Sequence, residues 1–293
     1  MSSSTVARAT HRLLLRPPPP PAHRPYRWSA QGGSAAAQRR PWLERLRRAL
    51  EEDLFVLHYQ PIVSLTDGGV VHYEALLRLA DEPEGRLIAP ARFLPAAERY
   101  GLITEIDRMV LEKVTAMLGS GGGQSGVGEC GVGVAMNLSA LSVTEGGMLS
   151  DIQRALERHG ADPARLVVEL TETAAISDMK RASAFCAGVH ELGSSIALDD
   201  FGVGFGSFGY LKRLPFRYLK IDGDFIRGLP GSPTDQLVVK ALVAVVHGMG
   251  SQAIAECVGD EATLCLLRRY GVDFAQGFHV GRPRPLVELS ASG

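Results

Sequence analysis

The sequence predicts an α/β protein, and the number and order of its segments favour a (β/α)8 barrel. Eight short β-rich runs alternate with helix-period segments from about Trp42 onward, and strands that alternate with helices imply parallel pairing. Roughly 245 residues with eight strands match the usual size of such a barrel. A doubly wound parallel sheet has the same local signature, so the pattern alone leaves that architecture open.

The expected strands are short runs rich in β-branched and other apolar residues. They cover 57–63, 70–77, 132–138, 166–170, 195–198, 218–221, 252–258 and 274–278. Most of them are separated by a segment whose apolar residues recur every three or four positions. These expected helices cover 104–118, 148–159, 180–192, 234–249 and 261–270.

Residues 1–43 differ from the rest of the chain in charge. They hold seven arginines and no lysine, aspartate or glutamate, so they carry +7 in a chain of net charge −1, and the remainder carries −8. The proline run 17–21 favours an extended polyproline II conformation. We expect a disordered Arg/Pro-rich N-terminal segment over 1–43 and a folded domain over 44–293. A transit peptide, or a tail that touches an anionic surface, is the alternative for the first segment.

Composition and charge exclude several classes of protein. With 45% hydrophobic and 22% charged residues, the chain is typical of a soluble globular protein. The net charge of −1 disfavours a DNA or RNA polymer as partner, because binding to nucleic acid depends on a basic excess. No apolar run reaches the roughly 18 residues that a membrane span needs. The four cysteines form no C-x-x-C pair, which favours free thiols in a cytoplasmic protein.

Polar side chains interrupt or end the apolar strands. They are Glu74, Asn137, Glu169, the adjacent pair Asp199 and Asp200, Lys220, Glu256 and Gln276. In a barrel the carboxyl ends of the strands converge on one face, where five carboxylates would repel one another unless cations neutralise them. Oxygen ligands without histidine or cysteine favour Mg²⁺ or Mn²⁺. The aspartate pair suits two metals about 3.5 to 4 Å apart, a clamp for in-line displacement at a phosphodiester.

Lys220 lies in an apolar strand, where two interpretations are open. The lysine can extend to the surface, with Asp222 as its partner or as a loop cap. Alternatively it faces the carboxylates, where its fixed positive charge would orient hydroxide and stabilise the charge that grows on a phosphorane.

Seven motifs, in order, resemble those of the EAL-domain cyclic di-GMP phosphodiesterases over about residues 45–288. They are Tyr73-Glu-Ala-Leu-Leu-Arg, preceded by Tyr59-Gln-Pro-Ile, then Asn137-Leu-Ser, Glu169-Leu-Thr-Glu, Leu198-Asp-Asp-Phe-Gly, Leu219-Lys-Ile-Asp, Ala255-Glu and Gln276-Gly-Phe. The resemblance implies a modified TIM barrel whose first strand is antiparallel to the others. It further implies hydrolysis of cyclic di-GMP to linear pGpG with Mg²⁺ or Mn²⁺ in a two-metal site, and a homodimer.

The resemblance also implies roles for individual residues. Glu74, Asn137, Glu169, Asp199 and Asp200 would hold the metals; Lys220, Glu256 and Gln276 would act in catalysis; Gln60, Leu77, Arg78 and Pro95 would contact the dinucleotide; and Glu172 would anchor the loop after the aspartate pair. Arg78 suits a phosphate because its planar fork matches two oxygens. For Leu77 and Pro95, ordinary barrel packing is an equal alternative.

Four positions depart from the family pattern. Cys257 and Gly259 stand where the family usually has Gly and Glu, and Val203 and Gly206 replace a Thr or Ala and a Ser in the loop after the aspartate pair. These changes bear on rate and regulation more than on metal binding. The alternative function is a catalytically weak EAL domain that acts as a cyclic di-GMP sensor or partner-binding module.

Overall fold

The computed structural model describes residues 40–81, 85–120, 131–202 and 208–289, and the structural statements below concern these residues. The chain divides at Arg40 into two units. The first unit, residues 1–39, lies outside the described residues, so its expected disorder stays a prediction. The second unit begins with helix α1 (Arg40–Glu51), which starts four residues before the expected domain boundary.

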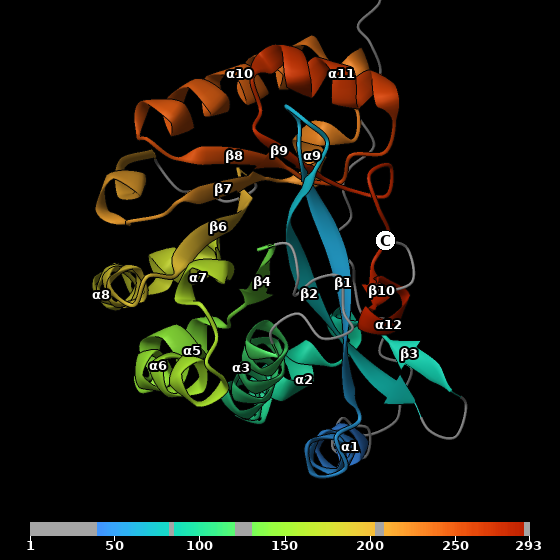
Figure 1. The fold of residues 1–293 in the computed structure, drawn as a ribbon, viewed down its shortest axis with the longest axis vertical. Helices are drawn as coiled ribbons and strands as arrows, with labels where there is room; N and C mark the ends of the chain where they lie inside the picture. Colours follow the sequence, from blue (N-terminus) through green and yellow to red (C-terminus); the bar gives the residue numbers. More distant parts are fainter. Residues whose placement is uncertain (1–39, 82–84, 121–130, 203–207, 290–293) are drawn as a thin grey trace, which may run out of the picture. The chain divides into compact units, whose positions relative to one another are not determined.

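Eight strands of the described residues close into a barrel (Figure 1). In their order around the barrel they are β1 (Phe55–Ser64), β2 (Val70–Asp81), β4 (Gly133–Asn137), β5 (Leu166–Thr171), β6 (Ser195–Phe201), β7 (Tyr218–Ile221), β8 (Gln252–Ala255) and β9 (Phe274–Gln276). β9 pairs back with β1, which closes the ring and excludes the doubly wound sheet. Two short strands extend it: β3 (Arg86–Ile88) pairs with β2, and β10 (Arg284–Pro285) pairs with β1.

The first strand runs against the others. β1 is antiparallel to β2, from the pair Phe55 and Leu79 to the pair Val63 and Val70, and it is also antiparallel to β9. Every neighbouring pair from β2 through β4 to β9 is parallel. The expected barrel with an antiparallel first strand is therefore confirmed.

The five expected long helices are confirmed, each within one residue or two of its expected bounds. They are α3 (Ile103–Gly119), α6 (Met148–His159), α8 (Met179–Glu191), α10 (Pro233–Gly248) and α11 (Glu261–Tyr270). Their ends follow from local chemistry. The Ser232 and Asp260 side chains accept hydrogen bonds from the first turns of α10 and α11, and Gly271 ends α11 at φ +77°.

Shorter helices complete the described part of the chain. They are η1 (Pro90–Arg92), α2 (Leu94–Arg99), α5 (Ala140–Thr144), η2 (Pro163–Arg165), α7 (Glu172–Ser177), η3 (Phe208–Arg213), α9 (Gly223–Ile226), η4 (Leu229–Gly231) and α12 (Leu286–Leu289). They were not predicted, because one or two turns are too short to show a periodic pattern. No described helix is both long enough and apolar enough to span a bilayer.

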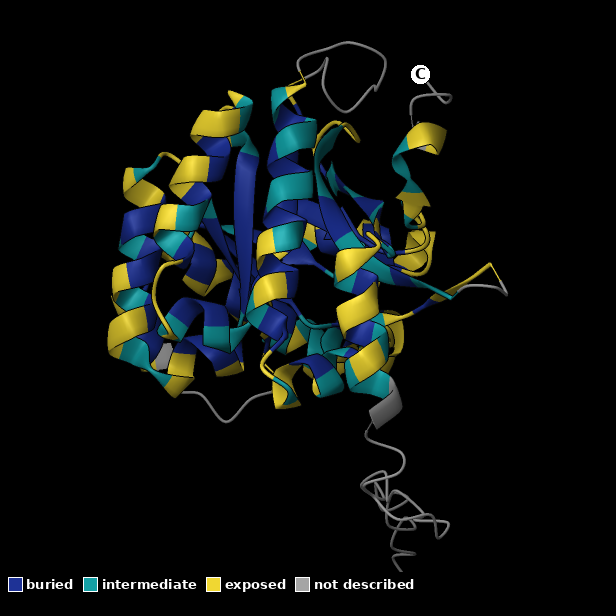
Figure 2. Cartoon of the chain, turned by 90° about the horizontal axis from the view of Figure 1, so that it is seen from below, coloured by how far each residue is buried: buried dark blue, intermediate teal, exposed yellow. Residues whose placement is uncertain are grey.

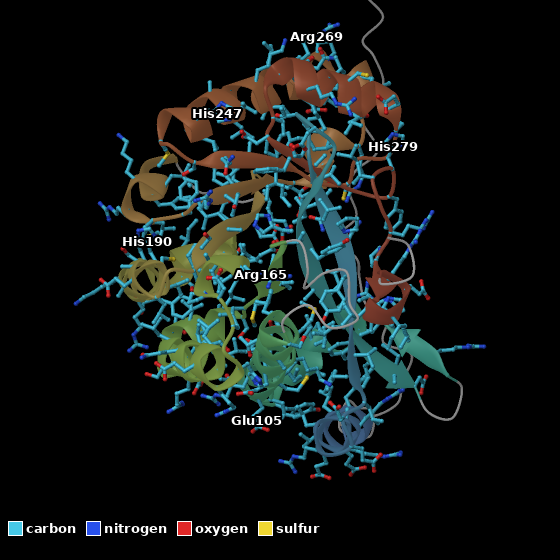
Figure 3. The ribbon with its side chains drawn as sticks, viewed as in Figure 1. Glu105, Arg165, His190, His247, Arg269 and His279 are labelled. Carbon is cyan, nitrogen blue, oxygen red and sulfur yellow. The ribbon has the colours of Figure 1, made fainter. Side chains whose placement is uncertain are left out.

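The helices pack one face on the strands and expose the other (Figure 2). In α6, for example, Met148, Ile152 and Leu156 are buried, as the three- and four-residue spacing predicts. Charged side chains such as Glu105 on α3 and Arg269 on α11 point away from the strands (Figure 3). The strands therefore lie between solvent-facing helices and a separate barrel interior.

The barrel interior is built in two layers. The lower layer is apolar and consists of Ile62, Ala135, Val167, Ala197, Tyr218, Ile254 and Phe274. Residues two positions apart in a strand face the same side, and in each of these seven strands the inward residue two positions nearer the carboxyl face is polar. On the reversed β1 this residue precedes Ile62 and is Gln60. The eighth strand, β2, contributes Glu74 to the same layer. The fold thus places one polar side chain per strand above an apolar floor.

His72 lies beside this floor and gives a first prediction. Its ring meets Tyr218 edge-on, with 5.1 Å between centroids, and burial, followed by the charge of Arg217, lowers its pKa to about 4. Since the unfolded imidazole titrates near pH 6.5, the unfolded chain takes up the proton first as the pH falls below 6.5. We expect this histidine to lower the free energy of unfolding by about 2 kcal/mol between pH 7 and pH 5.

Urea unfolding at both pH values tests the contribution of His72. The loss of stability in the His72→Gln variant should be about 2 kcal/mol smaller than in the wild type. His190→Gln, which changes an exposed histidine on α8, should lose as much stability as the wild type. Equal losses in all three proteins would show that His72 is not held neutral in the folded state.

Candidate active site

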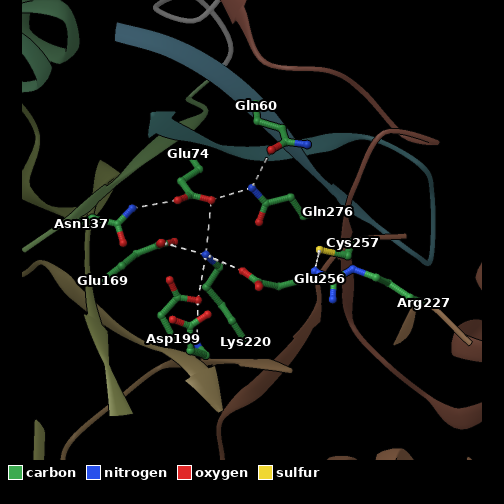
Figure 4. Close-up of polar contacts among 11 residues, drawn as sticks. Gln60, Glu74, Asn137, Glu169, Asp199, Lys220, Arg227, Glu256, Cys257 and Gln276 are labelled. Atoms are coloured by element: carbon green, nitrogen blue, oxygen red, sulfur yellow. Dashed lines mark hydrogen bonds and ion pairs between the residues drawn. The ribbon is translucent and has the colours of Figure 1, made fainter. Parts of the chain in front are cut away.

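The upper layer of the barrel interior gathers polar side chains from all eight barrel strands (Figure 4). Its members are Gln60 on β1, Glu74 on β2, Asn137 on β4, Glu169 on β5, Asp199 on β6, Lys220 on β7, Glu256 directly after β8 and Gln276 on β9. Seven of them are the residues that the sequence analysis placed at strand ends. The structure therefore brings this predicted set together on the carboxyl face of the barrel.

Lys220 is the centre of the cluster. Its side chain is 1% exposed, and Nζ lies 2.7 Å from Glu256 Oε1 and 2.8 Å from Glu169 Oε2. Asp199 Oδ1 is 3.1 Å away and Glu74 Oε2 is 3.3 Å away. Asp222 instead caps α9, where Oδ1 accepts from the Asp224 amide. The lysine thus faces the carboxylates, and the alternative in which it reaches the surface is wrong.

One ammonium group does not balance four carboxylates, and the pKa values reflect this. Burial, and next the charge of Glu74, raises the pKa of Glu169 well above its ordinary value. Burial raises the pKa of Glu256 to about 8, with Asp199 adding to the rise and Lys220 opposing it. Burial lowers the pKa of Lys220, but the four carboxylates outweigh it and raise the pKa well above the ordinary value. Four carboxylates carry more negative charge than one ammonium group neutralises. Without further cations, the cluster relieves this excess by binding protons more tightly.

Two amide side chains hydrogen-bond to Glu74, and a third contacts one of them. Asn137 Nδ2 donates to Glu74 Oε1 at 2.8 Å, and Gln276 Nε2 donates to Glu74 Oε2 at 2.6 Å. Gln276 Nε2 also lies 3.3 Å from Gln60 Oε1, and Gln60 donates in turn to the Gly281 carbonyl. The amide donors are therefore engaged within the protein, which leaves the oxygens of Asn137 and Gln276 available to the cluster.

The donor set fits hard divalent cations. Glu169 Oε1 and Gln276 Oε1 are buried and have no hydrogen-bond partner among the described residues. One carboxylate oxygen each from Asp199, Asp200 and Glu256 also lies within 4.8 Å of the other two. Buried oxygens without donors are costly, and Mg²⁺ or Mn²⁺ coordinates such atoms. The residues present thus match a metal site made of oxygen ligands.

The backbone at Asp200 explains how two consecutive residues serve one site. Successive strand residues point to opposite sides, so an extended Asp200 would turn its carboxylate away from Asp199. Asp200 instead adopts φ +53°, and its amide donates to Asp199 Oδ1 at 3.0 Å. Aspartate tolerates this left-handed conformation better than most residues. Burial, and next Asp199, raises the pKa of Asp200, as expected for two adjacent carboxylates.

The residues predicted to contact a dinucleotide lie apart from the ion-pair cluster, Gln60 excepted. Arg78 donates to the Leu77 carbonyl at 2.8 Å, and burial lowers its pKa while Glu74 raises it. The Leu77 side chain packs against the hydrophobic core, and Pro95 is exposed in the first turn of α2. Their contact with a ligand stays a prediction.

Glu172 lies where a loop anchor would be. It is buried at the start of α7, and Oε2 accepts from the Gly202 amide at 3.3 Å. The following residues 203–207, which include the departures at Val203 and Gly206, lie outside the described residues.

The departure at Cys257 is visible in the backbone. Cys257 adopts φ +54°, a conformation that glycine takes without strain, and Arg227 Nη2 lies 3.3 Å from its Sγ. Gly259 has open space around it, since a Cβ there would meet nothing nearer than 4.0 Å. A larger side chain at 259 would therefore fit without a clash.

Sequence reasoning missed Asp107. This buried residue of α3 accepts hydrogen bonds from Ser139 and Ser142, next to Asn137. The available signal was a single aspartate between the apolar positions Ile106 and Val110 of an expected helix.

The fold and site together define a TIM-barrel protein with a carboxylate-rich site at the carboxyl ends of its strands. The model of the EAL domain matches residues 43–283. The chain belongs to the EAL domain family, as its motifs suggested.

Two curated relatives carry names that bear on function. The chain is 39% identical over 252 residues to the bifunctional diguanylate cyclase/cyclic di-GMP phosphodiesterase MucR of Pseudomonas aeruginosa, covering 85% of this chain and 36% of MucR. It is 38% identical over 247 residues to the cyclic di-GMP phosphodiesterase PdeB of Shewanella oneidensis, covering 84% of this chain and 28% of PdeB. The chain thus spans about a third of the length of these relatives.

Two solved structures share the fold. The PaMucR phosphodiesterase in complex with c-di-GMP matches with a TM-score of 0.78 at 38% identity, covering 85% of this chain and 99% of that one. The FimX EAL domain of Pseudomonas aeruginosa bound to c-di-GMP matches with a TM-score of 0.75 at 31% identity, covering 83% and 96%.

Proposed function

We propose that this protein is a metal-dependent phosphodiesterase that hydrolyses cyclic di-GMP to linear pGpG. The observation that carries the proposal is the buried Lys220 among four carboxylates at the carboxyl ends of the strands. The names of MucR and PdeB, and the c-di-GMP in the two related structures, support this substrate. All eight positions implied for metal binding and catalysis are kept in this chain, which favours turnover over a purely sensory role.

The metal ligands follow from the cluster. Glu74, Asn137, Glu169 and Asp199 would hold one Mg²⁺ or Mn²⁺, and Asp199 and Asp200 would hold a second, with Glu256 beside it. Bound divalent metal lowers the pKa of water and screens the charge of a phosphodiester.

The chain's own residues orient the reaction. The Lys220 ammonium group is held in place by its carboxylate partners and positions the attacking water while it stabilises charge on the phosphate. Glu256, whose Oε1 lies 2.7 Å from Lys220 Nζ, is beside the place of that water and would accept its proton in the carboxylate form. The water oxygen bonds to phosphorus, the bond from phosphorus to the 3′ oxygen breaks, and the 3′ oxygen takes up a proton from solvent, which gives linear pGpG. Gln276 holds Glu74 in place, and Arg78 would bind a phosphate through its planar fork.

Chromatography of a reaction mixture tests the activity. Purified protein incubated with cyclic di-GMP and Mg²⁺ or Mn²⁺ should produce pGpG, and the same mixture with a chelator should not. Nucleotide binding without product at micromolar enzyme would instead support the catalytically weak sensor.

The same proposal includes a cytoplasmic homodimer with residues 44–293 as its folded domain. Helix α10 supports the dimer, because it exposes Leu237 (68%) and Val245 (38%) on one side, with Ala241 and Ala244 between them. Light scattering should give a dimer for the wild type and a monomer for Leu237→Glu. A monomeric wild type at micromolar concentration would contradict this part of the proposal.

A further inference from the structure

Asp107 is a buried carboxylate that serves three donors from one turn. Asp107 is 6% exposed. The Oδ2 atom accepts from the Ser139 amide at 3.0 Å, from Ser139 Oγ at 2.7 Å and from Ser142 Oγ at 2.6 Å. No ion-pair partner of Asp107 occurs in the part of the chain that the structure describes. These hydrogen bonds therefore compensate the burial of the charge.

The turn that Asp107 holds leads directly out of β4. Ser139 is the N-cap of α5, and its Oγ accepts from the Ser142 amide at 3.2 Å. On the strand side, the Leu138 amide donates to the Glu169 carbonyl at 3.0 Å. Asp107 thus ties helix α3 to both ends of a four-residue turn, and this turn begins two residues after Asn137.

The position of the Asn137 side chain depends on the local backbone more than the positions of the neighbouring carboxylates do. A neutral amide offers a metal a weaker ligand than a carboxylate, so its contribution depends on the place and direction of the amide oxygen. The side chain is exposed and has one described side-chain contact, the hydrogen bond to Glu74 Oε1. The remaining constraint on the amide is the backbone between β4 and α5.

We propose that Asp107 is a positioning residue that directs the Asn137 amide oxygen to the metal by holding the Ser139 turn. The proposal rests on the proposed function, since it assumes that the cluster binds Mg²⁺ or Mn²⁺. Residues that orient metal ligands typically contribute about 10- to 100-fold in metal affinity.

Titration calorimetry of metal-free protein with Mn²⁺, without nucleotide, tests the proposal. Asp107→Ala should weaken Mn²⁺ binding about tenfold, and Ser139→Ala, which keeps the backbone donor, should weaken it less. Thr115→Val is the matched control. Thr115 lies on the same helix and is 0% exposed, and among the described residues its hydroxyl bonds only to the Leu111 and Glu112 carbonyls of that helix. Its loss should therefore lower stability without changing Mn²⁺ affinity.

A double-mutant cycle separates positioning from general destabilisation. In an Asn137→Ala background the Asp107→Ala change should have little further effect on Mn²⁺ affinity, because the ligand that it positions is gone. A tenfold loss in both backgrounds, or unchanged affinity in Asp107→Ala, would overturn the proposal. If Asp107→Ala does not fold, Asp107→Asn replaces it in both backgrounds. The asparagine amide has nearly the same shape as the aspartate carboxylate, but its oxygen is a weaker hydrogen-bond acceptor. A wild type that binds no Mn²⁺ would instead refute the proposed function.

Discussion

The Lys220→Met variant is expected to lose turnover by at least about a hundredfold and to unfold more easily by about 3 kcal/mol without metal. Methionine keeps most of the apolar stem but leaves four inward carboxylates without their counter-charge. Breaking a buried ion pair from one side costs several kcal/mol for this reason. Turnover should fall through kcat, with KM for cyclic di-GMP largely unchanged, because the ammonium group acts on the water and on the charge of the transition state.

Urea unfolding in a chelator and steady-state kinetics with Mn²⁺ check both effects. Lys113→Met is the control, because Lys113 forms one partly exposed ion pair with Asp53, at 2.6 Å, and should cost no more than about 1 kcal/mol. Mn²⁺ should stabilise the Lys220 variant more than the wild type, since the metal supplies the missing charge. A variant as stable as the wild type would show that Lys220 does not neutralise the carboxylates. A variant in which only KM changes would refute its role in catalysis.

The Asp199→Asn variant is expected to lose turnover by about a thousandfold while its metal-free form remains at least as stable as the wild type. Asp199 is the carboxylate assigned to both metals. Losing about 4 kcal/mol of metal-dependent stabilisation of the transition state lowers the rate about a thousandfold. Stability should not fall, because the charge of Asp199 raises the pKa values of Glu169, Asp200 and Glu256 and so opposes their ionisation.

Kinetics and unfolding on the same protein check this pair of effects. Asp260→Asn is the control: Asp260 follows β8 and caps α11, and asparagine caps a helix equally well, so activity and stability should both stay near the wild type. Substantial turnover in Asp199→Asn would refute the bridging assignment. A clear loss of metal-free stability would mean that the ion pair with Lys220 outweighs repulsion within the cluster.

Much of the fold was predictable because it depends on local pattern. All eight barrel strands and five of the six described helices of ten or more residues follow from two- and four-residue periodicities that a single sequence displays; the sixth, α1, was not predicted. The reversed direction of β1 could not be predicted from those patterns, because they do not encode strand direction. It was predicted from the family resemblance. The short strands β3 and β10 pair only at the edges of β2 and β1, so they depend on contacts distant in sequence.

The site was predictable in its members more than in its geometry. Polar residues inside apolar strands stand out, so Glu74, Glu169 and Lys220 could be found from the sequence. The direction of the Lys220 side chain needed the register of four neighbouring strands, and the left-handed turn at Asp200 has no sequence signal beyond the tolerance of aspartate for it. The Asp107 contact with Ser139 joins residues 32 positions apart, and nothing local connects them.

The reversed first strand also determines where the barrel domain begins. In a barrel of parallel strands, the segment before the first strand enters at the face opposite the active site. Here β1 starts at the carboxyl face, and α1 lies beside the end of β2, where Arg45 Nη2 meets Asp81 Oδ1 at 2.5 Å. The chain therefore enters the barrel domain on the side that holds the cluster, at the far end of the β1–β2 pair, and not at the opposite face.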